Sequence, residues 1–197
     1  MADTKAFAES AWLIERRIQE LGAKEGDPSP IGGATGWRKH DVWESLKTVS
    51  HFNLGVALEL RLKCLLALHH IEPRKRGAQG HYLRKLLEQL PNELSDLLEA
   101  LYRQAKAERN VTLLAFISTQ RPERPKGPPN RRLDTLRDFC AYLDEDVGLW
   151  SKRYAWEQLD GPGKWRHYLT DLDAMLDFLD RSEHLAAELA KEKGLVK

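Results

Sequence analysis

The stretch LGVALELRLKCLLALHH, residues 54–70, decides the fold. Its apolar residues recur at helical spacing. They cover nearly the whole circumference of the helix, whereas the apolar residues of a surface helix form one stripe. A helix that is apolar on nearly every side is contacted from several directions. Residues 54–70 are therefore predicted to form the central helix of a helical bundle.

A spaced pair of opposite charges interrupts this apolar segment. Glu59 and Lys63 stand four residues apart, in the order that favours an ion pair on one helix. Charges on a buried helix are usually paired, because an isolated charge in a medium of low dielectric constant is costly. We interpret Glu59 and Lys63 as a structural polar pair.

Apolar residues at helical spacing also mark most of the chain outside this segment. The central segment is predicted to cover 37–70, with a bend near 53–55, because it exceeds the length of an ordinary helix. Residues 22–36, with five glycines and two prolines, are predicted to form a loop. The run 111–117 is interpreted as a helical continuation or a buried extended piece, since one strand-like run without a partner is poor evidence for a sheet. The other predicted helices cover 5–21, 81–90, 92–108, 133–149 and 165–193.

A chain of 197 residues with 42% hydrophobic and 31% charged residues has room for one packed core with large solvated helix faces. The expected fold class is therefore all-α, a single-domain bundle of about five or six helices. Residues 1–36 are expected to form an N-terminal helix and a Gly/Pro loop, and residues 37–193 to form the bundle.

The net charge of +1 gives no overall field that would attract nucleic acid, so an anionic partner would need a local basic segment. The run RPERPKGPPNRR, residues 121–132, has four prolines and five cations against one anion, and it is predicted to be a surface loop. The candidate anion-binding residues are Arg121, Arg124, Lys126, Arg131 and Arg132.

The cysteines and the N-terminus indicate the compartment. Cys64 and Cys140 lie inside apolar helical patterns, which favours buried free thiols in a reducing cytoplasm. The first ten residues lack the features of a secretory signal, and no stretch approaches the roughly 18 apolar residues of a membrane span. We expect a cytoplasmic protein without membrane association.

Seven histidines raise the question of a metal site. His69 and His70 are adjacent and so face different sides of a helix, and neither HExxH nor CxxC occurs. His167 and Asp171 are spaced to share a helix face, but two ligands are too few for a tetrahedral site. The glycine run at 32–36 lacks the adjacent lysine–hydroxyl pair of a phosphate-binding loop. We expect no metal and no cofactor.

A family resemblance rests on the central segment and the helix after it. Ala57-x-Glu59-x-x-x-Lys63-x-Leu65-Leu66 is followed by a polar connection and by Gly80-His81-x-Leu-x-x-Leu-x-x-x-Leu-Pro. This order resembles the HEPN superfamily of small all-α domains, as does the later run Arg153-Tyr154-x-x-Glu157, and the resemblance spans about residues 38–180. It implies a HEPN-like bundle. Many HEPN proteins are metal-independent ribonucleases of toxin–antitoxin, anti-phage and CRISPR systems, whereas others act as binding or dimerisation modules.

The resemblance also implies where catalysis would lie. The family's active site is an Arg-x4-6-His motif near the start of a late helix, doubled across a homodimer, in which histidine moves a proton and arginine holds the phosphate. The late helix of this chain reads Arg137-Asp-Phe-Cys-Ala-Tyr-Leu, without the histidine. Arg76 and Arg74 stand at suitable distances before His81, but in the loop between two earlier helices.

His81, Arg76 and Arg74 are therefore the candidate catalytic residues of a metal-independent ribonuclease. The structural interpretation is favoured for His81, as a residue that bonds the first turn of its helix or the Glu59/Lys63 pair. A second candidate region comprises Arg153, Tyr154, Glu157 and His167.

Two functional hypotheses follow. The first is a HEPN-like protein of a bacterial defence or toxin-type system, a homodimer that engages RNA or a protein encoded by a neighbouring gene, with weak or no ribonuclease activity. The alternative is a non-catalytic dimerisation or scaffold domain with no role in nucleic-acid binding. The dependence of RNA binding on salt separates the two.

Overall fold

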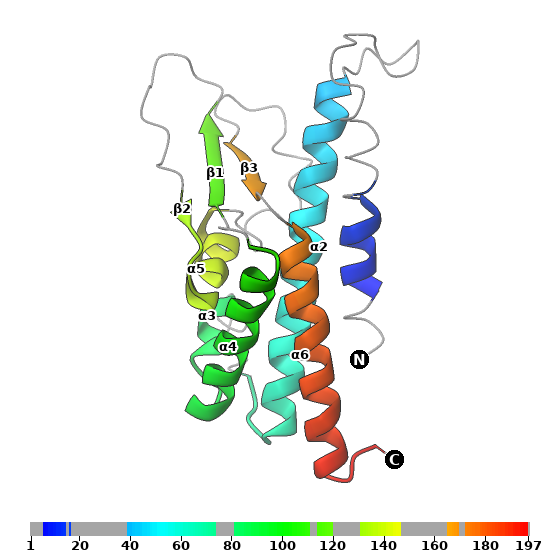
Figure 1. Cartoon of the computed structure of the whole chain (residues 1–197), viewed down its shortest axis with the longest axis vertical. Helices are drawn as coiled ribbons and strands as arrows, with labels where there is room; N and C mark the ends of the chain where they lie inside the picture. Colours follow the sequence, from blue (N-terminus) through cyan, green and yellow to red (C-terminus); the bar gives the residue numbers. More distant parts are fainter. Residues whose placement is uncertain are drawn as a thin grey trace.

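The computed structural model describes residues 6–14, 16, 39–73, 81–110, 114–119, 131–146, 165–169 and 172–196 (Figure 1). A helical segment at 6–14 precedes five α-helices, and a π-helical turn continues the fourth of them. The helical elements are α2 (Lys39–Leu68), α3 (Leu83–Leu87), α4 (Asn92–Glu108), α5 (Leu136–Ala141), η2 (Tyr142–Asp146) and α6 (Leu172–Glu192). The strands are β1 (Leu114–Thr119), β2 (Arg131–Arg132) and β3 (Trp165–Leu169).

Helix α2 is the centre of the bundle, as the sequence predicts. It packs against α6 and α3, and the hydroxyl of Ser50 donates to the carbonyl of Ala11, 3.2 Å away, which ties the segment 6–14 to α2. α4 also packs against α6. The all-α helical bundle is therefore confirmed as the fold class. The core residues that α2 contributes at 0–1% exposure are Leu54, Ala57, Leu58, Leu62, Leu65 and Leu66.

The bend predicted near 53–55 does not interrupt the helix, because α2 runs without a break from Lys39 to Leu68. A glycine inside a helix costs about 1 kcal/mol relative to alanine, but Gly55 is buried between Leu54 and residues that pack in the core. Burial of the surrounding apolar side chains offsets that cost. α2 ends at Leu68, and His70 in the turn that follows has a positive φ of 56°.

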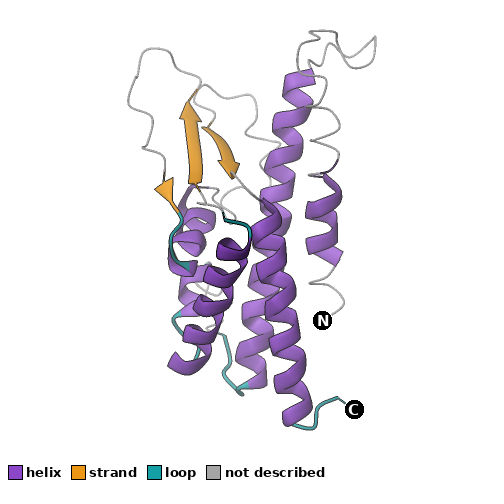
Figure 2. Cartoon of the chain, in the orientation of Figure 1, coloured by secondary structure: helices purple, strands orange, loops and turns teal. Residues whose placement is uncertain are grey.

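A small antiparallel sheet of order β2-β1-β3 lies at one end of the bundle (Figure 2). A helical interpretation of 111–117 is therefore wrong for residues 114–117, which are extended in β1. The start predicted for the closing helix is wrong as well, since 165–169 form β3 and α6 begins at Leu172. Ala115 pairs with Leu169, so the partner of β1 lies far away in the sequence and local periodicity does not reveal it.

Other boundaries follow from capping. The helix predicted at 133–149 begins at Leu136, because Thr135 and Asp138 form a reciprocal capping box at its start. The helix predicted at 81–90 is the shorter α3, followed by turns at 88–90.

Among the described helices, none combines the length and apolarity needed to cross a bilayer.

Candidate functional site

The structure brings together Glu59, Lys63 and His81, two from α2 and one from the approach to α3. Oε1 of Glu59 accepts a hydrogen bond from Nζ of Lys63 at 2.5 Å and lies 2.9 Å from Nδ1 of His81. The ammonium of Lys63 is 3.4 Å from the same ring nitrogen. The Glu59 side chain is only 7% exposed, whereas Lys63 and His81 are about one-third exposed (29% and 35%). A buried carboxylate thus binds two half-buried nitrogen groups.

The hydrogen-bond pattern assigns the histidine tautomer. A carboxylate only accepts, so Nδ1 of His81 is the nitrogen that donates to Glu59. A neutral imidazole with its proton on Nδ1 carries the lone pair on Nε2, which is the arrangement in which a carboxylate orients a histidine for proton transfer. The same bonds also neutralise the buried carboxylate and attach the chain before α3 to α2. These contacts are therefore enough to explain a structural role for His81, without any substrate.

Asp144 holds the next turn of the same junction. Its carboxylate, on η2, accepts the backbone N–H groups of Leu83 at 2.9 Å and Arg84 at 3.0 Å. These are orphan donors of the first turn of α3, whose N-cap residue, Tyr82, makes no side-chain cap. Two buried acidic residues from different elements, Glu59 and Asp144, therefore fix the start of α3. Sequence reasoning missed Asp144, and the one signal was the lack of a capping side chain before Leu83.

Arg61 is a second residue that sequence reasoning missed. It stands between Glu59 and Lys63 on α2, and its side chain is 1% exposed. Its Nη2 donates to Oε2 of Glu183 on α6 at 2.9 Å. The signal was available in the sequence, because Arg61 is a third charge in the apolar stretch 54–70. Its two-residue offset from Glu59 directs it toward another face of the helix.

The described end of the basic segment 121–132 is anchored on α4. The hydroxyl of Tyr102 and the ammonium of Lys106 both donate to the carbonyl of Leu133 at 2.7 Å, and Lys106 also reaches the carbonyl of Asp134 at 3.1 Å. Burial raises the pKa of Tyr102 and lowers the pKa of Lys106. Arg132, just before this anchor, has a side chain that is 68% exposed and pairs with Asp134 at 3.1 Å.

The remaining predicted site residues fall into two groups. His167 lies in β3, opposite Ile117 of β1, and Arg131 lies in β2, opposite Ala115. Those that lie outside the described residues are Arg74, Arg76, Arg121, Arg124, Lys126, Arg153, Tyr154 and Glu157. The pairing of His81 with Arg76 or Arg74 therefore stays a prediction.

Comparison with protein-family models, curated proteins and solved structures finds no match to this chain.

Proposed function

We propose that this chain is a HEPN-like domain of a bacterial defence or toxin-type system, a cytoplasmic homodimer that engages RNA or a partner protein and has weak or no ribonuclease activity. The observation that carries the proposal is the cluster at the start of α3. His81 is bound to Glu59 and lies beside Lys63, so the histidine nearest to the family's spacing already has a structural task.

The late helix supports the same conclusion. A histidine separated from Arg137 by four to six residues would occupy position 142, 143 or 144. These positions hold Tyr142, Leu143 and Asp144, which are all buried. Asp144 is committed to the first turn of α3. The catalytic histidine is therefore missing from the place where the family carries one, and general acid–base catalysis typically contributes about 10²–10⁴-fold.

The charge distribution favours RNA contact at the end of the molecule that carries the sheet. α4 has four acidic and two basic residues, and α6 has six acidic and two basic residues, so both helices carry net negative charge. RNA phosphates are repelled by such faces. The basic segment 121–132 starts next to the end of β1 and ends in β2, where Tyr102 and Lys106 anchor the chain. RNA is therefore the anionic partner that we argue for.

Binding of single-stranded RNA by the whole chain is expected to weaken steeply as salt rises, because each phosphate contact releases counterions. Fluorescence anisotropy of a labelled oligonucleotide across a salt series measures this slope. Arg132→Ala is expected to reduce the slope by about 1. Arg103→Ala is the matched control: its side chain is 66% exposed and pairs with a carboxylate, Glu99, as Arg132 does with Asp134.

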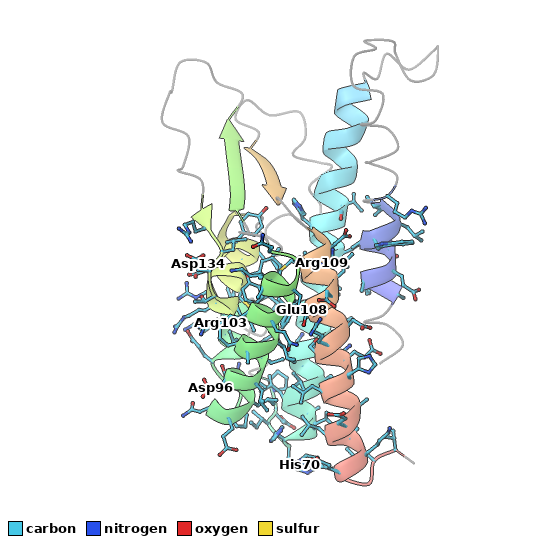
Figure 3. All side chains as sticks on the ribbon, viewed as in Figure 1. His70, Asp96, Arg103, Glu108, Arg109 and Asp134 are labelled. Atoms are coloured by element: carbon cyan, nitrogen blue, oxygen red, sulfur yellow. The ribbon has the colours of Figure 1, made fainter. Side chains whose placement is uncertain are left out.

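Arg103 lies on the side of α4 that faces away from α6 (Figure 3), and its removal is expected to leave the slope unchanged. No detectable binding even at low ionic strength would instead favour the dimerisation or scaffold domain. Light scattering on the same samples reports whether the chain is a dimer.

A further inference from the structure

The helical segment 6–14 has two different faces. The residues of its inner face recur at helical spacing and are buried or half-buried: Phe7, Ala8, Ala11 and Ile14. This face packs on the bundle, since Phe7 and Ala8 contact the core and the carbonyl of Ala11 accepts the hydroxyl of Ser50 on α2. The exposed residues of the segment lie on the opposite face of the helix.

That outer face is apolar at its centre and charged at both ends. Trp12 and Leu13 are 40% and 60% exposed, although both are large apolar side chains. Glu9 and Arg16 are exposed as well, and the four residues are spaced i, i+3, i+4 and i+7, so they share one side of a helix. Cζ of Arg16 lies 4.8 Å from the centroid of the Trp12 ring. We call these four residues the outer stripe.

The outer stripe belongs to the periphery of the molecule. The segment 6–14 lies on the side of α2 away from α4 and α5 (Figure 1). Val49 immediately precedes Ser50 on α2 and is itself 46% exposed, so the helix that carries the segment adds a third exposed apolar side chain. Large apolar side chains that gather on a surface, with a polar rim, mark contacts with another macromolecule.

We propose that the outer stripe is the contact surface of the homodimer, so its partner is a second copy of this chain. Two stripes that pack antiparallel, with a two-fold axis between Trp12 and Leu13, place Trp12 of each copy on Leu13 of the other. Glu9 and Arg16 are equally far from that axis, so each copy sets its Glu9 opposite Arg16 of the other.

Charge complementarity therefore selects the partner and its orientation. Antiparallel copies form two ion pairs, whereas parallel copies would set equal charges against each other. The surface rests on the homodimer of the proposed function. Four partly exposed side chains on each copy make a contact smaller than the roughly 1,200–2,000 Å² of a stable interface. We therefore expect a dimer that dissociates on dilution.

Sedimentation equilibrium of the whole chain over a concentration series measures the dissociation constant of the dimer. Glu9→Arg and Arg16→Glu are each expected to raise this constant about tenfold, because either change turns both ion pairs into repulsions. An equimolar mixture of the two variants is expected to associate as the parent chain does, since each copy supplies the charges that the other lacks. The double variant Glu9→Arg/Arg16→Glu exchanges the charges within one chain and is expected to recover as well.

Leu13→Glu tests the centre of the outer stripe and is expected to raise the dissociation constant by about tenfold or more, because it places a charge in the middle of the contact. Leu97→Glu is the matched control, since Leu97 is 51% exposed on α4, and it is expected to dimerise as the parent chain does. Far-ultraviolet circular dichroism checks that each variant is folded.

The outcomes separate this surface from the proposed function. If the parent chain dimerises and the Glu9, Leu13 and Arg16 variants dimerise equally well, the outer stripe is the wrong surface and the homodimer stands. Losses in the single variants that neither the mixture nor the double variant recovers would contradict the antiparallel pairing. A parent chain that is monomeric at every concentration would overturn both the surface and the homodimer, and RNA engagement is tested separately by the salt series.

Discussion

Leu62→Ala is expected to lower the free energy of unfolding by about 2–5 kcal/mol, the range for truncating a fully buried leucine. Leu62 is 0% exposed and lies on α2, the helix that packs against both α3 and α6. Because elements pack on several sides of α2, the space left by the side chain cannot be filled by the movement of one neighbour. Urea denaturation followed by far-ultraviolet circular dichroism measures the loss.

The matched control is Leu97→Ala on α4, a leucine that is 51% exposed. Substitutions at exposed positions usually change stability by less than about 0.5 kcal/mol. Leu66→Ala, also at 0% exposure, is expected to resemble Leu62→Ala. A loss at Leu62 no larger than at Leu97 would show that α2 is not the centre of the core.

Asp144→Ala is expected to cost about 2–4 kcal/mol, because it leaves two backbone donors of α3 without their acceptor and each such buried group costs about 1–3 kcal/mol. The donors are the N–H groups of Leu83 and Arg84. Helix α3 has only five residues and no side-chain cap of its own, and Asp144 is the acceptor of its N–H groups at Leu83 and Arg84. Hydrogen exchange is expected to quicken first at residues 83–87.

Asp144→Asn is the informative control, because the amide of asparagine keeps one acceptor oxygen while its NH₂ group cannot accept. We expect about half the effect of the alanine variant. Equal losses for alanine and asparagine would assign the effect to charge, and no loss in either would mean that α3 does not depend on η2.

Local periodicity predicted the helical core, and it failed where structure depends on distant partners. The leucines of 54–70 reveal a central helix because their spacing is a property of that segment alone. The pairing of Phe116 with Tyr168 and of Ala115 with Leu169 joins β1 to β3, a strand that is remote in sequence. The residues of one strand do not indicate which distant segment pairs with it. The aromatic residues at 165–169 also fit a helix pattern, which extended the predicted closing helix too far.

The polar contacts also divide into local ones, which the sequence predicts, and long-range ones, which it does not. Glu59 and Lys63 are four residues apart on one helix, so their contact is local and readable from the sequence. The contact of His81 with Glu59 requires the chain reversal after α2. The sequence predicted this contact only as one of two possible bonding roles of His81, the other being a bond to the first turn of its own helix. Asp144 and the Arg61–Glu183 pair join separate elements, so their contacts depend on packing that a single sequence does not display.

The measurement that tests the central claim most directly is a metal-free incubation of the purified chain with structured and single-stranded RNA. The parent chain is expected to cleave weakly or not at all. His81→Ala is expected to lower the melting temperature, because Glu59 and Lys63 lose their link to the start of α3, with no activity to lose. Arg76→Ala is expected to change neither the melting temperature nor the amount of cleavage. Robust cleavage by the parent chain that His81→Ala or Arg76→Ala abolishes, in variants that remain folded, would contradict the structural role of His81 and make it a catalytic residue.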